Sequence, residues 1–342
     1  MKKKIIKIGI IGAGWFGCHL SHFLLKKKDY DVTLFEKKND IFLGSSGFNQ
    51  FRYHKGFHYP RSKSTIKEIK SNSKKFYKEY KKFIKFPRYN YYSIAKKKSL
   101  IDFETYKDIL KNNKIKFKNC KKISHFNYSN LEGVINSTEG VILNDKIKKF
   151  FKRKLRGVLK YNTCIDRVYK LHKNYDLIID CSNNTFKNYF SKLVKYVLTI
   201  SFIFKSKNLK NYPTLTVMDG DLPSIYQYSD KKNFYTLTHS NYTHIKKFSS
   251  FNNLLKYKKK LPKKKVNNLK TKSIESISKY YKNFDEKFNY KGYFLSYKIL
   301  PNEETDKRET FVFRNKNLIS FFSPKISNIF TAEKIINSII LK

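Results

Sequence analysis

The chain has 342 residues, of which 74 are Lys or Arg and 26 are Asp or Glu, so its formal net charge at pH 7 is +48. This length allows a large core and predicts two domains, or one domain with a smaller one inserted in it. Only eight of the 74 basic residues are Arg, and Lys is spread along the whole sequence, whereas nucleic-acid-binding proteins favour Arg and cluster their charge. We therefore expect a solvated lysine surface and no nucleic-acid partner.

The cysteine pattern and the first residues indicate the compartment. Cys18, Cys120, Cys164 and Cys181 are far apart and form no Cys-x-x-Cys pair, which is typical of a reduced cytoplasmic protein. Lys2–Lys4 and the apolar stretch after them imitate a signal peptide, but glycines interrupt that stretch. No run approaches the ~18 apolar residues of a membrane-spanning helix. We expect a cytoplasmic protein without a membrane span.

A predicted strand and a glycine turn come first. Residues 7–17 read Lys-Ile-Gly-Ile-Ile-Gly-Ala-Gly-Trp-Phe-Gly, and the next apolar run ends at Glu36. In a dinucleotide-binding βαβ unit, Gly12 allows the tight turn, Gly14 lets backbone N–H groups approach a pyrophosphate, and Gly17 lets the helix pack closely on the strand. Glu36 would accept hydrogen bonds from a ribose. The turn alone predicts a dinucleotide site and leaves NAD and FAD both open.

Helical and extended patterns alternate through the first half of the chain. Thr65 and Glu68 form a predicted capping box before an apolar stripe, and Pro87 ends that helix. Asn144 is expected to cap a further helix. A buried parallel strand ends at Asp180, and strand ends of this kind carry the ligand contacts of open α/β sheets. The elements expected in this half are helices from the glycine turn to Lys28 and over 66–84, 103–110 and 144–155, and extended runs at 32–36, 91–95 and 115–117, around Ile165 and at 177–179.

The second half is rich in alternating β patterns. They run from Leu198 to about Pro301 and predict an antiparallel sheet, interrupted by a Lys-rich helix over 266–284. A strand and a helix through Ile340 then complete the first fold unit. The expected class is α/β, a Rossmann-like nucleotide-binding domain with an inserted antiparallel β-rich substrate domain. We assign residues 1–75, 140–195 and 302–342 to the first domain, and residues 76–139 and 196–301 to the second.

The stretch from Gln50 to Arg61 concentrates functional side chains. If it is extended, Gln50, Arg52, His54 and His58 lie on one face, and aromatic rings lie on the other. It holds two of the eight Arg and two of the eight His of the chain. Such a concentration predicts a cavity wall that contacts a cofactor or an anionic substrate. An aromatic core segment with satisfied histidines is the alternative.

Several segments together resemble a known family. They are the glycine turn with Glu36, the run Ser-Ser-Gly-x-Asn-Gln-x-Arg-x-His-x-Gly-Phe-His-Tyr-Pro-Arg-Ser from Ser45 to Ser62, Asp180-Cys181-Ser182, Met218-Asp219-Gly220 and the terminal 319–333 segment with Ser323-Pro324-Lys325-Ile326. These segments resemble the FAD-dependent oxidoreductases of the D-amino-acid oxidase superfamily, and more narrowly a group often encoded among surface-polysaccharide genes. The likeness extends over nearly the whole chain.

The resemblance implies FAD as the cofactor, held by a three-layer Rossmann-like domain. The glycines would cradle the pyrophosphate, Glu36 would bind the adenosine ribose, and Ile165 would place its backbone against the adenine. Asn49, Arg52 and His54 would approach the phosphates or the isoalloxazine. The cofactor-binding positions that it implies are Gly12, Gly14, Trp15, Phe16, Gly17, Glu36, Lys37, Ser46, Asn49, Arg52, His54, Ile165, Ser182, Ser323, Lys325 and Ile326.

The same resemblance implies hydride transfer from a CH–NH or CH–OH group of a small or nucleotide-linked metabolite. His58 and Tyr59 would lie above the flavin ring, and Arg308 stands where the family's substrate-anchoring Arg would lie, which favours an anionic substrate. Lys325, beside the last predicted helix, would stabilise negative charge near flavin N1. No histidine or carboxylate spacing indicates a metal site.

Two other functions remain open at this point. UDP-galactopyranose mutases share the fold and place a His-rich motif near the flavin, so a non-redox sugar mutase is one alternative. A basic protein that binds a nucleotide or nucleic acid through a degenerate Rossmann fold is the other. Flavin absorbance separates both flavin-dependent functions from the last.

Overall fold

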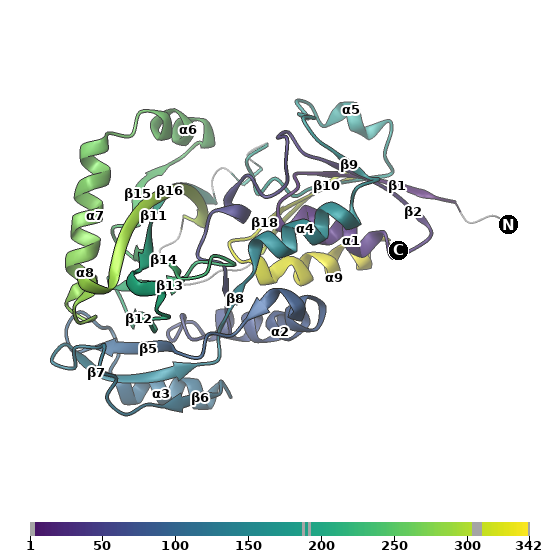
Figure 1. Cartoon of the computed structure of the whole chain (residues 1–342). Coiled ribbons are helices and arrows are strands. Elements are labelled where there is room, and N and C mark those ends of the chain that lie inside the picture. Colours follow the sequence, from purple (N-terminus) through teal and green to yellow (C-terminus); the bar gives the residue numbers. More distant parts are fainter. Residues whose placement is uncertain (1–3, 187–188, 191–192, 303–309, 341–342) are drawn as a thin grey trace.

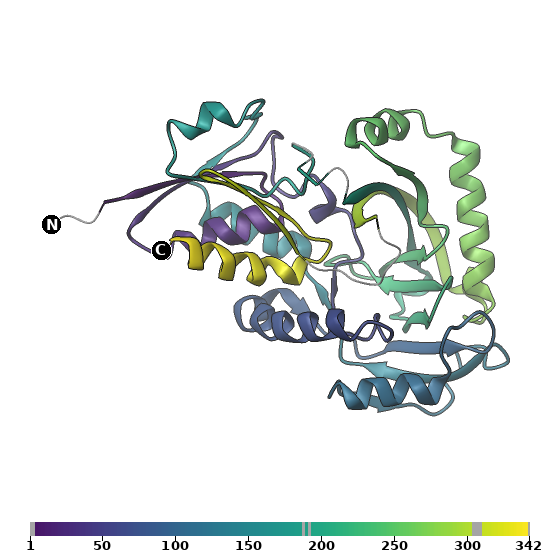
Figure 2. The same ribbon diagram turned by 180° about the vertical axis from the view of Figure 1, so that it is seen from behind.

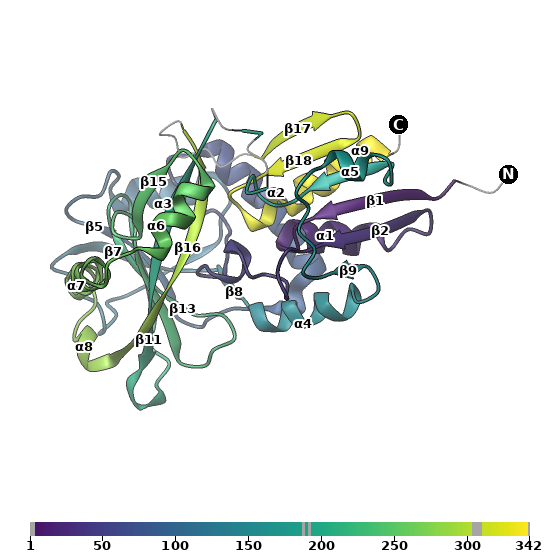
Figure 3. The same ribbon diagram turned by 90° about the horizontal axis from the view of Figure 1, so that it is seen from above.

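The computed structural model describes residues 4–186, 189–190, 193–302 and 310–340 (Figure 1). Two large sheets lie side by side, each with its own helices, and a small sheet lies between them (Figures 1 and 3). No helix within these described ranges is both long enough and apolar enough to cross a bilayer.

The first sheet has six strands, and the glycine turn follows its central strand. Five strands run parallel, and β17 pairs antiparallel with β18. The central strands are short apolar runs because both faces are covered. In spatial order the strands are β17 (Phe311–Asn315), β18 (Leu318–Phe322), β10 (Leu177–Asp180), β1 (Ile6–Ile11), β2 (Tyr30–Phe35) and β9 (Leu159–Lys160).

Helices from distant parts of the chain cover one face of this sheet (Figure 2). Helix α1 (Trp15–Leu24) packs against α4 (Asn144–Lys154) and α9 (Ile329–Ile340), and α2 (Lys63–Tyr80) packs against α9. Their buried side chains form one apolar core with β1, β2 and β10. The short α5 (Tyr169–His172) lies against β10.

The second sheet has nine strands and is mostly antiparallel. Only β5 and β12 pair in parallel, and the two longest strands, β11 and β16, pair over their whole length. Helix α7 (Lys263–Ser278) packs against β13 and β14, and α3 (Phe103–Asn112) packs against β5. The strands are β15 (His244–Phe248), β11 (Val194–Ser206), β14 (Phe234–His239), β13 (Pro223–Gln227), β12 (Thr214–Met218), β5 (Asn90–Ala95), β7 (Leu131–Ser137), β6 (Phe117–Asn119) and, paired with β11, β16 (Phe288–Pro301).

A small sheet connects the two halves. Strand β8 (Gly140–Ile142) pairs with β3 (Arg52–Tyr53) on one side and β4 (Ile84–Lys85) on the other. The remaining short elements are α6 (Phe251–Lys259), α8 (Phe284–Lys287) and the 3₁₀ turns η1 (Ser45–Gly47), η2 (Lys81–Phe83), η3 (Lys207–Leu209) and η4 (Ile326–Asn328).

Several local predictions were wrong. Helix α2 begins at Lys63, and its cap is Ser62, whose hydroxyl accepts from the Thr65 N–H, so Thr65 is not the cap. Asn144 is the first residue of α4, whose cap position is Leu143, and its side-chain Oδ1 has no hydrogen-bond partner among the described residues. The single helix expected over 266–284 is two helices, α7 and α8, separated at Asn283, which has φ 53°.

Two extended predictions also differ from the structure. Ile165 lies in no strand, although its side chain packs partly buried against the end of β1. In the 50–61 stretch only Arg52 and Tyr53 form a strand, because Phe51 has φ 51° and Gly56 has φ 105°. The stretch is therefore a short strand between two turns, and the simple alternation of faces does not extend along it.

Candidate active site

The glycine turn is built by three close approaches. Gly12 has φ +95°, and a Cβ there would lie 3.2 Å from Cα of Ser182. A Cβ on Gly17 would lie 2.0 Å from the carbonyl oxygen of Gly12, and a Cβ on Gly14 would lie 2.9 Å from Oγ of Ser46. Only glycine fits at Gly12 and Gly17, and a Cβ on Gly14 would have to displace the Ser46 hydroxyl. The turn therefore brings backbone N–H groups close to one another at the start of α1, where an anion is favoured.

Glu36 closes the turn from the end of β2. Its Oε2 accepts from the Ala13 N–H at 2.8 Å, and its Oε1 accepts from the Lys38 N–H at 3.0 Å. The Ser46 hydroxyl accepts from the Trp15 N–H at 3.1 Å. A carboxylate and a hydroxyl thus lie on either side of the turn, which is the donor and acceptor set that a ribose and a pyrophosphate require.

Other predicted residues lie around this turn in different ways. The Trp15 side chain is buried in the core, where it stacks on Phe42, so only its backbone faces the turn. Phe16 and Ile165 are partly buried, and Lys37 is exposed. Ser182 lies directly beside Gly12, and its hydroxyl accepts from the Phe186 N–H.

The closing segment meets the same edge of the sheet. The Ser323 N–H donates to Oδ1 of Asn183 at 3.4 Å, and Ile326 begins the turn η4 before α9. Because β1, β10 and β18 are parallel neighbours, their carboxyl ends bring Gly12, Ser182 and Ser323 to one edge. Asn49 lies at the far end of the 45–49 turn, where its amide binds the Ser45 carbonyl and the Phe51 N–H.

Arg52 is buried between the two halves of the molecule and is held by side chains of the second sheet. Its Nε donates to Gln50 at 3.1 Å, its Nη1 donates to the hydroxyls of Tyr92 at 3.1 Å and Thr216 at 2.9 Å, and its Nη2 donates to Ser224. The guanidinium lies over the Tyr226 ring, 4.0 Å from its centroid. These contacts use four of the five N–H groups, and the fifth, on Nη2, has no hydrogen-bond partner among the residues that the structure describes.

Glu139, which sequence reasoning missed, is the buried carboxylate of this region. Its Oε2 accepts from the Tyr92 hydroxyl at 2.6 Å, and its Oε1 accepts from the Lys55 N–H at 2.8 Å. Burial raises the pKa of Glu139, but His54, Tyr92 and Lys55 together outweigh burial and lower it. Glu139 reaches this region because it directly precedes β8. A single Glu in a loop belongs to no motif, so the sequence did not indicate this position.

Lys325, His54 and His58 surround the same space. The Lys325 ammonium lies 4.1 Å from the centroid of the Tyr59 ring, and burial followed by the charge of Arg52 lowers the pKa of Lys325 to about 7. Burial lowers the pKa of His54 to about 4 and that of His58 well below its usual value, with Lys325 and Arg52 adding to both. The region therefore favours an added negative charge.

One arginine of the 50–61 stretch does not enter this cluster. Arg61 forms an ion pair with Asp219, just after the end of β12. Arg308 lies outside the described residues. Among the residues that the structure describes, no three His, Cys, Asp or Glu side chains are grouped as metal ligands are.

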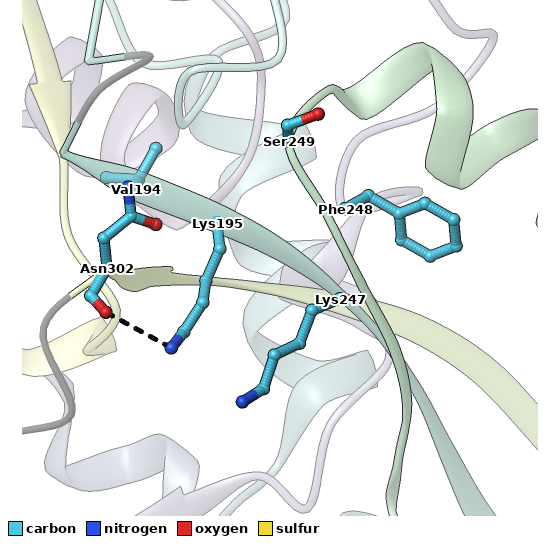
Figure 4. Close-up of a pocket in the computed structure, with 6 residues that line it drawn as sticks. All are labelled: Val194, Lys195, Lys247, Phe248, Ser249 and Asn302. Carbon is cyan, nitrogen blue, oxygen red and sulfur yellow. Dashed lines mark hydrogen bonds between the residues drawn. The ribbon is translucent and has the colours of Figure 1, made fainter.

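Two cavities border the second sheet. One, of about 380 Å³, is lined by Gly44, Phe48 and the middle of β16 and adjoins the 45–47 turn. The other, of about 270 Å³, lies between β11 and β15 and is lined by Lys195 and Lys247 (Figure 4). Neither cavity is lined by a predicted site residue.

Known proteins resemble this chain over part or all of its length. The NAD(P)-binding Rossmann-like domain family matches residues 10–80, the segment with the glycine turn. A FAD-dependent monooxygenase of Fusarium mangiferae is 27% identical over 340 residues, which cover 97% of this chain and 90% of that protein. One of Aspergillus flavus is 25% identical over 364 residues, covering 96% of this chain and 84% of that protein.

Solved flavoenzyme structures share the fold at low sequence identity. The L-α-glycerophosphate oxidase of Mycoplasma pneumoniae, with FAD bound, aligns with a TM-score of 0.67 and 16% identity over 95% of this chain and 92% of its own. The L-proline dehydrogenase of P. horikoshii aligns with a TM-score of 0.63 and 12% identity over 96% of this chain and 90% of its own. The expected fold class is confirmed: the chain has the fold of D-amino-acid oxidase-type flavoenzymes.

Proposed function

We propose that this protein uses FAD to oxidise a small anionic metabolite at a CH–NH or CH–OH group. The class, an FAD-dependent oxidoreductase, is confirmed by the relatives and the fold, and neither the mutase nor the basic binding protein is favoured. The observation that supports an anionic substrate is the pair of cations Arg52 and Lys325: Arg52 is buried, and its charge helps to lower the pKa of Lys325.

The residues around the turn fit a bound FAD. Gly12, Gly14 and Gly17 would hold the pyrophosphate, and Glu36 would bind the adenosine ribose. Ser182 and Ser323 would line the cofactor site at the same edge of the sheet. The remaining predicted cofactor positions stay proposals, as do the catalytic roles of His58, Tyr59 and Arg308 and the division into domains. When bound, FAD supplies the acceptor for the two electrons of the oxidation.

Arg52 and Lys325 would act on the substrate rather than on the adenosine. Arg52 is held in place by its hydrogen bonds to Gln50 and the second sheet. Its remaining N–H would therefore bind and orient an anionic group without further loss of side-chain entropy in Arg52. Lys325 would gain a proton as the anion binds, because a nearby negative charge raises the pKa of an amine. Arg52 and Lys325 would thus hold the anionic end of the substrate and orient its C–H bond toward the flavin.

The test is flavin content followed by a substrate screen. We expect the purified protein to show flavin absorbance, or to acquire it with added FAD, and small carboxylates or phosphates to bleach it without oxygen. Absence of flavin after reconstitution would contradict the cofactor. Bleaching by neutral metabolites alone would contradict the anionic substrate.

A second reaction deserves the same screen, because both full-length relatives are named monooxygenases. In that case one atom of molecular oxygen would enter the substrate and the other would leave as water, with an external two-electron reductant supplying the electrons. Reaction under ¹⁸O₂ separates the two outcomes: an oxidase releases hydrogen peroxide and an unlabelled product, whereas a monooxygenase gives a labelled product.

A further inference from the structure

His54 and Glu139 approach each other inside the candidate active site, although 85 residues separate them. The distance from Nδ1 of His54 to Oε1 of Glu139 is 3.5 Å, and the Glu139 side chain is fully buried. The His54 side chain as a whole is 21% exposed, yet its Nδ1 is buried and has no hydrogen-bond partner among the described residues, so the Glu139 oxygen acts on it as a nearby negative charge. The exposed part of the ring is therefore not the edge that carries Nδ1.

The carboxylate decides which nitrogen of the ring holds the hydrogen. Nδ1 faces a negative oxygen, so the neutral ring is stable with its hydrogen on Nδ1, and Nε2 keeps a free lone pair. Neutral histidine is the form present at pH 7, because burial lowers the pKa of His54 to about 4, Lys325 and Arg52 lower it further, and Glu139 partly opposes them. Glu139 accepts hydrogen bonds from the Tyr92 hydroxyl and the Lys55 N–H, which favour its ionised form.

His58 lacks this arrangement. Its Nδ1 is buried and without a hydrogen-bond partner, as that of His54 is, but the charged groups that lower its pKa are Arg52, His54, Lys325 and Lys298. Within the described part of the chain, no carboxylate forms an ion pair with its ring. Of the two histidines, His54 is therefore the one with a carboxylate beside its ring.

We propose that His54 is the proton acceptor of the reaction and that Glu139 is the positioning residue that keeps Nε2 of His54 unprotonated and open to the substrate. This rests on the proposed function. Oxidation of a CH–OH or CH–NH group releases a hydride and a proton: the hydride goes to FAD, the C–H and O–H or N–H bonds break, a C=O or C=N bond forms, and the proton goes to Nε2.

Tyr92 connects this pair to Arg52. Its hydroxyl donates to Glu139 at 2.6 Å and accepts from Nη1 of Arg52 at 3.1 Å. The hydrogen bond from Tyr92 reduces the negative charge on the Glu139 carboxylate, so Glu139 raises the pKa of His54 less than it would without this bond. Removal of the Tyr92 hydroxyl should therefore raise the pKa of His54, whereas removal of the charge on Glu139 should lower it.

The test is a ¹⁵N and ¹³C NMR titration of the histidine rings in the flavin-loaded protein and in the protein without flavin. In the wild type we expect the Nδ1–H tautomer of His54 at pH 7. Glu139→Gln should lower the His54 pKa and populate the Nε2–H tautomer, and Tyr92→Phe should raise the His54 pKa. Glu104→Gln, the same change at an exposed ion pair with Lys107, should leave His54 unchanged.

The kinetic readout uses the metabolite that bleaches the flavin in the screen. His54→Gln should lower the bleaching rate by about 10²–10⁴-fold, the range of general acid–base catalysis, and Glu139→Gln should lower it less, with normal flavin content. An Nε2–H tautomer in the wild type, or a His54→Gln rate equal to the wild-type rate, would overturn the proposal. If Glu139→Gln does not fold, Tyr92→Phe carries the NMR test. A protein that takes up no FAD would refute the proposed function instead, and the titration without flavin would still test the tautomer.

Discussion

At the residue scale, the glycine turn makes the sharpest prediction. Gly17→Ala places a Cβ about where the Gly12 carbonyl oxygen lies, 2.0 Å away, so α1 must shift away from β1. We expect FAD content to fall below a tenth of the wild-type value, measured by absorbance after reconstitution. Gly157→Ala is the matched control, since a Cβ there meets nothing within 4 Å; equal flavin loss in both variants would contradict the packing argument.

Lys325 gives a prediction on pH dependence. Burial and then Arg52 lower its pKa from 10.5 to about 7, so the unfolded chain binds one more proton than the folded protein between those pH values, and stability rises with pH across that window. The free-energy cost of burying the charged Lys325 side chain is therefore greatest below about pH 7. Lys325→Met should raise the free energy of unfolding at pH 6 by a few kcal/mol, and the gain should shrink toward pH 10.

The same substitution should weaken ligand binding, because the ammonium is one of the two cations of the cluster. Urea unfolding at pH 6 and pH 9.5 measures the first effect, and perturbation of the flavin spectrum by benzoate measures the second. If the difference in free energy of unfolding between Lys325→Met and the wild type were the same at pH 6 and at pH 9.5, Lys325 would not be desolvated in the folded protein. Unchanged benzoate affinity would remove it from the anion site.

At the element scale, helix α2 depends on its cap. The Ser62 side chain is buried and accepts from the Thr65 N–H, so Ser62→Ala should lower the free energy of unfolding by about 1 kcal/mol. Ser71→Ala, an exposed position of the same helix, should have little effect. Thermal unfolding of the two variants side by side decides whether Ser62 caps the helix, as in the structure.

Elements with strong apolar periodicity were predictable, and tertiary geometry was not. The βαβ start, the strand ending at Asp180 and the terminal strand and helix follow from local patterns. The fate of residues 50–61 does not, because positive φ at Phe51 and at Gly56 depends on packing against other segments. Glu139 illustrates the limit: its role comes from contacts with His54 and Tyr92, which no local pattern contains.

At the scale of the whole molecule, the charge of +48 predicts weak, non-specific attraction to polyanions. We expect any retention on duplex DNA to be independent of sequence and to disappear between roughly 50 and 200 mM salt, because it depends on counterion release. A mobility-shift series over that salt range checks this. Sequence-selective binding that survives 200 mM salt would require a nucleic-acid function after all.

The position of β18 has a consequence for biosynthesis. This strand lies between β10 and β17 and is made about 140 residues after β10. Until it is synthesised, β10 is an open edge that reads Leu-Ile-Ile-Asp, and open apolar edges template aggregation. Chains that stop before β18 should therefore be cleared or precipitate rather than persist as partly folded domains. In the proposed cofactor site, which includes Ser323 and Lys325, FAD would bind only after translation has passed these residues.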